Sequence, residues 1–231
     1  MAVQAALGND MRIIANFHKG EPVRFISHLD ILRLMQRAMR RAQLPLTFSQ
    51  GFNPHPVMAF ASALSVGYTS DGEWLDVMLD APVAPEAFAA RMNAVLPEGL
   101  RILCALEIEE KTPTLTALLQ RAYYEVTLYL NAPEDKETLA NGIEPFLSAP
   151  IVVTKRTKGG MKQVDIRPQL LELRIADGPG QADCILSVTG RLTAHGGLQM
   201  ELLLNALTEA CGLAARWRVH RKAVDFDKIE V

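Results

Sequence analysis

The chain has 231 residues, of which 49% are hydrophobic and 22% charged, and its formal net charge is −2. These proportions are typical of a globular protein with a sizeable core, and the length allows one large domain or two small ones. No apolar run approaches the roughly 20 residues of a membrane span, and the N-terminus lacks the basic and apolar regions of a secretory signal. We therefore expect a short disordered leader, no membrane contact and a cytoplasmic location.

The first half of the chain alternates strand and helix signals. Apolar and β-branched runs predict strands at residues 11–17, 46–48 with a continuation at 57–63, 73–79 and 100–108. Helical periodicity predicts helices at 27–42 and 85–96, the first opened by a capping box of Ser27 and Asp30. The order β-α-β-β-α-β is typical of a ferredoxin-like split βαβ unit. Within 73–79, the alternation predicts that Leu75, Val77 and Leu79 share one side of the strand.

The second half repeats this order after a predicted linker at residues 111–121. Strands are expected at 122–130, 151–154, 164–166, 170–175, 184–189 and 214–219, and helices at 134–147 and 198–211. An extra hairpin surrounds the turn Lys158-Gly159-Gly160. We therefore predict an α+β fold of two tandem ferredoxin-like halves with antiparallel sheets, residues 1–110 and 122–231.

The three cysteines give no sign of a metal or redox site. Cys104, Cys184 and Cys211 are far apart and lack the close spacing of a disulfide framework or an iron–sulfur site. Each stands among apolar neighbours, so we interpret all three as buried small hydrophobic residues. No set of side chains has a recognised ligand spacing, and we expect neither a metal nor a cofactor.

Basic residues are concentrated in three windows, although the total charge is near zero. Residues 19–42, 154–174 and 214–222 together hold 16 of the 24 lysines and arginines and only 4 of the 26 acids. A local positive field attracts polyanions whatever the net charge of the whole chain. Nucleic-acid binding is therefore compatible with the composition, provided that these windows share one face.

The predicted helix 27–42 carries a face of four arginines, namely Arg33, Arg37, Arg40 and Arg41. Solvated helix faces usually alternate charge to gain i,i+4 pairing, but the nearby acid here is Asp30, which is partly committed to the helix start. The face therefore suits an anionic partner. Phosphates of an RNA, an acidic protein surface and a simple solvated face all stay open as interpretations. Arg24, which precedes the helix, is a further candidate contact.

A stiff polar loop follows this helix. Gly51 permits a turn with positive φ, and Pro54 and Pro56 restrict the backbone on both sides of His55. A loop held in this way loses little entropy on binding, and it displays Gln50, Asn53 and His55. Phe52 either plugs the core or stacks on a base.

Two further features suggest contacts with RNA. The segment around the Lys158-Gly159-Gly160 turn is either an exposed hairpin tip or a basic finger along a phosphate backbone, formed by Lys155, Arg156, Lys158 and Lys162. His28 and His55 are the candidates for general acid–base cleavage of RNA, which needs no metal because the 2′-hydroxyl supplies the nucleophile. The sequence does not fix the distance between the two histidines.

Several of these segments resemble the radical-SAM-linked protein family. The resemblance rests on Phe25-Ile26-Ser27-His28-Leu29-Asp30, Arg37-Ala38-x-Arg40-Arg41-Ala42, Leu44-Pro45, Ser49-Gln50-Gly51-Phe52-Asn53-Pro54-His55-Pro56, Val66-Gly67 and Ser70-x₂-Glu73. It is close over roughly residues 11–110 and looser in the second half. Members are small bacterial proteins or domains, fused to or encoded beside an uncharacterised radical SAM enzyme, so the resemblance implies such an enzyme as partner. It supplies no catalytic residues.

The sequence therefore favours a binding protein over an enzyme. The leading hypothesis is a non-catalytic accessory module that binds tRNA or rRNA and presents it to a radical SAM enzyme. One alternative is a metal-independent RNA endonuclease that uses His28 and His55. Another is a protein–protein adaptor whose arginine face docks on an acidic surface of the radical SAM partner.

Overall fold

The computed structural model describes residues 11–157, 159–180, 183–227 and 229. The leader expected at residues 1–10 and Lys158 lie outside the described residues. The chain divides into two compact units, one ending at Leu118 and the other beginning at Leu119, and each is described by itself. Both units combine helices with antiparallel strands, so the fold is mixed α+β, as the sequence predicts.

The first unit contains a four-stranded sheet. Strand β1 (Met11–Lys19) pairs antiparallel with β3 (Thr69–Leu79) and with β4 (Leu100–Ile108). Strand β2 (Met58–Phe60) pairs antiparallel with β3, which gives the order β4-β1-β3-β2. The helices of this unit are η1 (Glu21–Val23), α1 (His28–Arg41), α2 (Pro85–Asn93) and α3 (Leu115–Leu118).

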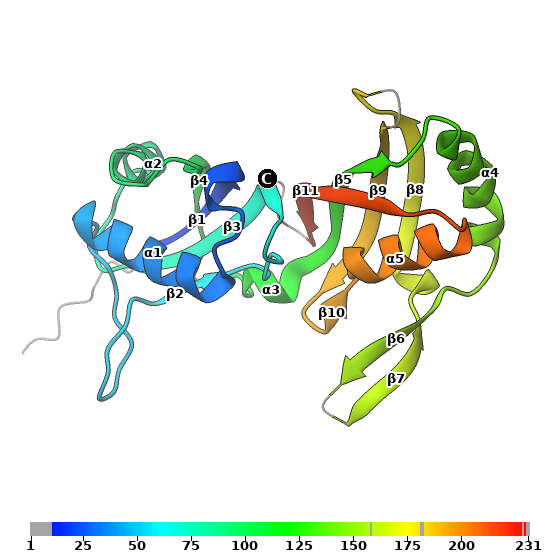
Figure 1. Cartoon of the computed structure of the whole chain (residues 1–231). Helices are drawn as coiled ribbons and strands as arrows, with labels where there is room; N and C mark the ends of the chain where they lie inside the picture. The colour runs from blue at the N-terminus through cyan, green and yellow to red at the C-terminus, as the bar shows by residue number, and fades with distance from the viewer. Residues whose placement is uncertain (1–10, 158, 181–182, 228, 230–231) are drawn as a thin grey trace, which may run out of the picture. The chain divides into compact units, whose positions relative to one another are not determined.

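The core of the first unit lies between the sheet and the helices α1 and α2 (Figure 1). Both helices contribute buried apolar side chains, among them Met35 and Phe88, which are fully buried. The predicted alternation along β3 is confirmed, because Leu75, Val77 and Leu79 all join this core with 0% exposure. Packing of these apolar faces against each other fixes α1 to the sheet and leaves its opposite face exposed.

One predicted element of the first unit, the strand at residues 46–48, differs from the structure. Residues 46–48 form no strand and make only the isolated bridges Leu46–Leu79 and Phe48–Pro56. Proline provides no amide donor, so Pro56 cannot extend this pairing into a regular ladder. The segment expected to be a linker contains α3 and the first residues of the next strand.

The second unit has a sheet of the same order. Strands β5 (Leu119–Leu130), β8 (Leu170–Asp177), β9 (Asp183–Thr193) and β11 (Ala215–Phe226) pair antiparallel in the order β8-β9-β5-β11, and β10 (Gly196–Gly197) adds a short pairing to β9. Its helices are α4 (Asp135–Ser148), η2 (Arg167–Gln169) and α5 (Met200–Ala210). The predicted extra hairpin is present as β6 (Val152–Thr157) and β7 (Gly160–Asp165). It pairs only with itself in the described structure and projects from its unit (Figure 1).

The prediction that all three cysteines are buried is wrong for Cys104. Cys184 is buried and Cys211 is half-buried, but Cys104 is exposed. Cys104 pairs with Asn16 at a register shift between β1 and β4, so its side chain lies on the face of the sheet opposite the core residues Ala15 and Phe17. Its apolar neighbours in the sequence give no sign of this shift.

Candidate nucleic-acid interface

The start of α1 is fixed by the predicted capping box. The Ser27 Oγ accepts a hydrogen bond from the Asp30 backbone N–H at 3.3 Å and donates one to Asp30 Oδ2 at 2.7 Å. The hydrogen bond from Ser27, followed by one from Arg33, lowers the pKa of the Asp30 carboxyl below its usual value. A charged Asp30 at this position stabilises the positive end of the helix and keeps the helix start in one place.

The four arginines of α1 are all exposed, but they differ in their contacts. Arg33 Nη1 donates to Asp30 Oδ1 at 3.0 Å, in an exposed pair that contributes little to stability. Arg41 donates to the backbone carbonyl of Val95. Arg37 makes no ion pair within the described part of the chain, so its charge is available to a partner.

Arg40 connects the arginine face to the polar loop. Its guanidinium carbon lies 5.9 Å from the centre of the Phe48 ring, a cation–π distance, and Phe48 directly precedes the loop. The structure therefore brings one predicted phosphate-contacting arginine next to the base of the predicted binding loop. The cationic helix face therefore adjoins the base of the loop at this contact.

The loop is closed by a hydrogen-bonded pair at its base. The Ser49 Oγ lies 2.9 Å from His55 Nδ1 and accepts from the His55 backbone N–H at 3.2 Å, while the Ser49 N–H donates to the His55 carbonyl at 2.9 Å. Gly51 has a φ of +130°, which favours glycine. Gln50, Asn53 and His55 are all exposed, as expected for groups that contact a ligand.

Arg24 is less available than the sequence suggests. Its Nη1 donates to Glu21 Oε2 at 2.9 Å, and its guanidinium carbon lies 4.4 Å from the centre of the Phe25 ring. The residue is half-buried, unlike the arginines of α1. Its positive charge is therefore largely satisfied within the chain.

The two candidate catalytic histidines make separate contacts. The His28 ring packs edge-on against the Phe60 ring, with the centroids 5.2 Å apart, whereas His55 is bound to Ser49 at the base of the loop. No hydrogen bond or ring contact joins the two histidines, both of which the structure describes. This arrangement gives no geometric support for an acid–base pair, and His28 contributes to packing.

The basic hairpin β6–β7 has an unusual pairing. Lys155 lies directly opposite Lys162 in its register, and Arg156 lies opposite Met161. Like charges that face each other across strands are destabilising. Arg156 and Lys162 are exposed and Lys155 is half-buried, while Lys158 lies outside the described residues.

The third basic window does not form a purely exposed surface. Arg221 is only 4% exposed and lies over the Tyr124 ring at 5.5 Å. Lys222 Nζ forms an ion pair with Glu125 Oε2 at 3.3 Å. The charges of this window are thus partly used within the second unit.

Lys19 belongs to a buried polar group that the sequence analysis missed. It is 3% exposed, and its Nζ donates to the Arg24 carbonyl at 3.0 Å. The same carbonyl accepts from the Gly67 N–H at 2.8 Å. Burial lowers the pKa of the Lys19 ammonium, an effect that the charge of Glu73 opposes. The available signal was the position of Lys19, because Ile13, Ala15 and Phe17 before it alternate into the core.

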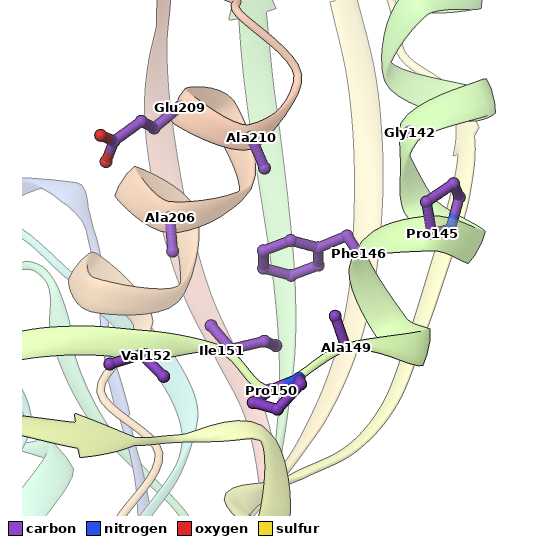
Figure 2. A pocket seen from close by; sticks show the side chains of 10 residues that line it. All are labelled: Gly142, Pro145, Phe146, Ala149, Pro150, Ile151, Val152, Ala206, Glu209 and Ala210. Carbon is purple, nitrogen blue, oxygen red and sulfur yellow. The ribbon is translucent and has the colours of Figure 1, made fainter.

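A groove of about 660 Å³ lies in the second unit, and none of the predicted site residues lines it. Figure 2 shows the Phe146 ring of α4 directed toward α5, with the Glu209 carboxylate pointing away from that ring. The lining is mostly apolar and comprises Gly142, Pro145, Phe146, Ala149, Pro150, Ile151, Val152, Ala206, Glu209 and Ala210. No group of three or more histidine, cysteine, aspartate or glutamate side chains could hold a metal ion among the described residues. No helix in the described part of the chain is long and apolar enough to cross a membrane.

Comparison with known proteins places the chain in a family. Residues 12–200 match the model of DUF2344, described as an uncharacterized protein conserved in bacteria. The chain belongs to this family. No curated protein matches it.

Solved structures similar to this DUF2344 chain include chains of two protein complexes. A Cbf5-Nop10-Gar1 complex matches with 13% identity and a TM-score of 0.49, over 94% of this chain and 50% of that one. The archaeal box H/ACA sRNP Nop10-Cbf5 complex matches with 13% identity and a TM-score of 0.48, over 94% and 49%. An unknown protein from Galdieria sulphuraria matches with 9% identity and a TM-score of 0.27, over 90% and 97%. The chain thus spans about half the length of the first two solved chains.

Proposed function

We propose that the protein is a non-catalytic accessory module that binds RNA, either tRNA or rRNA, and presents it to a partner radical SAM enzyme. The observation that carries the proposal is the contact between Arg40 and Phe48, which joins the arginine face of α1 to the base of the polar loop. A cationic surface beside a pre-ordered polar loop has the properties that RNA binding requires, namely charge for the phosphates and fixed groups for the bases. The radical SAM partner is proposed from the motifs of the first unit alone.

The residues have separate roles in this proposal. Arg33, Arg37, Arg40 and Arg41 contact phosphates, and Arg37 contributes most because no ion pair, hydrogen bond or ring contact in the described chain engages its guanidinium, unlike those of the other three. Gln50, Asn53 and His55 position the bound nucleotide. The β6–β7 hairpin makes a second phosphate contact, in which an anion between Lys155 and Lys162 relieves their mutual repulsion. The basic residues of the hairpin that we assign to this contact are Lys155, Arg156, Lys158 and Lys162.

We also propose that both units are versions of the ferredoxin-like split βαβ fold, with residues 111–121 as the linker between them. The orders β4-β1-β3-β2 and β11-β5-β9-β8, with antiparallel neighbours throughout, support this proposal. In both units the two middle strands of the order are the first and third main strands in sequence. The β6–β7 hairpin is then an insertion into the second unit.

Fluorescence anisotropy with labelled cellular tRNA and rRNA tests RNA binding. Affinity should fall steeply with salt, and Arg37→Glu should weaken binding and reduce the salt slope by about one. Lys111→Glu is the matched control, because it makes the same charge change at an exposed position outside the interface. Absence of binding at low salt, or equal losses in the two variants, would contradict the proposal.

Two further measurements separate the alternatives. Incubation with RNA in EDTA should leave the RNA intact, whereas cleavage that disappears in His55→Ala would favour the endonuclease. Capture of the radical SAM partner that survives nuclease treatment and depends on Arg37 would favour the adaptor.

A further inference from the structure

The tip of the Ser49–His55 loop presents a single aromatic side chain to solvent. Phe52 is 105% exposed, more than any other large hydrophobic residue of the described chain. Of the two interpretations that the sequence left open, core plug and base contact, the first is wrong. An aromatic ring held fully in water has both faces available to a ligand.

The loop that carries Phe52 is anchored below its tip. The Ser49–His55 pair closes it, and the Phe48–Pro56 bridge continues the closure toward the sheet. The Thr47 N–H donates to the Met78 carbonyl of β3 at 3.1 Å, and the Val57 N–H donates to the Thr47 carbonyl at 2.9 Å. The hydrogen-bonded base of the loop therefore holds the Phe52 ring in solvent. The ring makes no buried contact that binding of a ligand would have to break.

The stretch of chain that carries the ring favours an anionic ligand. Residues 31–70 contain four arginines and no aspartate or glutamate. Arg40 extends this cationic region to the base of the loop through Phe48. A negatively charged ligand therefore meets no repelling carboxylate from this stretch of chain.

An anionic membrane is the other ligand that combines negative charge with an apolar binding site. Insertion of Phe52 into lipid would bring the neighbouring Gln50 and Asn53 amides toward the hydrocarbon, where unsatisfied polar groups are costly. The same amides can donate to and accept from the edges of a nucleobase. An unpaired base fits both the ring and its neighbours, whereas lipid fits only the ring.

We infer that Phe52 is a stacking platform for an unpaired base, so that the RNA bound by this protein has a single-stranded loop, bulge or end at the interface. This inference rests on the proposed RNA binding and adds its substrate class. Aromatic stacking on bases is tolerant of base identity, so the ring confers a preference for single strands rather than for one sequence. The bases of a duplex are already stacked and would not reach it.

The test compares three substitutions at one position in the full-length chain. Phe52→Ala removes the ring, Phe52→Leu keeps an apolar side chain without an aromatic face, and Phe52→Trp keeps the face. Each is titrated against a short unstructured RNA that carries one fluorescent adenine analogue, against a duplex of the same length, and against vesicles of anionic phospholipid. Thermal unfolding checks that all variants keep the wild-type stability, which the exposure of Phe52 leads us to expect.

We expect the alanine and leucine variants to lose roughly fivefold to hundredfold in affinity for the single strand, and Phe52→Trp to retain it. Wild-type binding should also quench the adenine analogue, and duplex binding should be equal in all variants. Wild-type affinity for the single strand in the alanine and leucine variants would overturn the inference while leaving RNA binding intact. Vesicle binding that is preserved by leucine and lost with alanine would overturn it in favour of a membrane. Failure of the wild type to bind either RNA would remove the proposed function itself.

Discussion

Arg12 of β1 donates two hydrogen bonds to the Asp76 carboxylate of β3, from Nε to Oδ1 at 3.0 Å and from Nη2 to Oδ2 at 2.7 Å. Both residues are largely buried. The remaining Arg12 donors reach the carbonyls of Glu110 at 3.3 Å, of Thr112, and of Pro113 at 3.1 Å. The Arg12 guanidinium therefore connects the segment after β4 to the sheet. The Asp76 carboxylate orients that guanidinium.

Replacing Asp76 by alanine should destabilise the protein strongly. The change leaves Arg12 buried without its counter-charge, and breaking a buried pair in this way typically costs about 3–5 kcal/mol. The Arg12 bonds to three carbonyls place the expected loss in the free energy of unfolding near the lower limit. Urea denaturation measures it, with Asp80→Ala, at the exposed residue directly after β3, as the matched control, expected within about 0.5 kcal/mol of wild type. Equal stabilities of the two variants would contradict the role assigned to the pair.

Ser27→Ala should weaken the start of α1 and change the ionisation of Asp30. Loss of the N-cap hydroxyl costs about 1 kcal/mol of stability. The pKa of Asp30 should rise toward its usual value, because the Ser27 hydrogen bond is the largest cause of its lowering. Carboxyl chemical shifts followed by NMR as a function of pH measure this change directly. Ser65→Ala, at an exposed serine of the same unit, should leave the Asp30 titration unchanged.

The buried ammonium of Lys19 should make stability depend on alkaline pH. Its folded-state pKa lies below the usual 10.5, so in the window just below pH 10.5 the unfolded chain binds the proton that the folded chain has lost. The free energy of unfolding contributed by this group therefore rises with pH in that window. Lys19→Met should show a smaller rise than the wild type as the pH approaches 10.5, measured by urea denaturation. Parallel curves for the two proteins would show that Lys19 titrates normally.

Lys162→Glu should stabilise the β6–β7 hairpin and weaken RNA binding at the same time. The substitution replaces the repulsion with Lys155 by an attractive cross-strand pair, worth about 0.2–1 kcal/mol. Hydrogen exchange of the hairpin amides should slow, while RNA affinity falls because a phosphate contact is lost. Gln163→Glu is the control, since it adds a carboxylate to the opposite side of the hairpin, facing Thr154 instead of Lys155. If Lys162→Glu raises both the stability of the hairpin and the affinity for RNA, the proposed second phosphate contact is wrong.

The sequence predicts the local elements well because their signals are local. The Ser27 cap, the apolar alternation of Leu75, Val77 and Leu79, and the extra hairpin all follow from the identity and spacing of nearby residues. The predicted positions of β1, α1, β4 and β5 agree with the structure to within a few residues at each end.

Contacts between residues far apart in sequence could not be predicted in the same way. Nothing near Arg12 or Asp76 indicates that they meet, because their pairing depends on the register between β1 and β3. Cys104 looks like a core residue from its apolar neighbours, and its exposure depends on the register shift between β1 and β4 that pairs it with Asn16. Similarly, the contact between Arg40 and Phe48 depends on how the chain returns from α1 to the sheet.

The backbone carbonyl of Arg24 accepts two hydrogen bonds that support the segment leading into α1. It receives both the Lys19 ammonium from the interior and the Gly67 amide from the loop before β3, only three residues ahead of the helix cap. Loss of the Lys19 donor would remove one of these hydrogen bonds and weaken the support of the segment that leads into the arginine face of α1. Selection for ligand recognition in this protein can therefore act on side chains that no ligand ever touches.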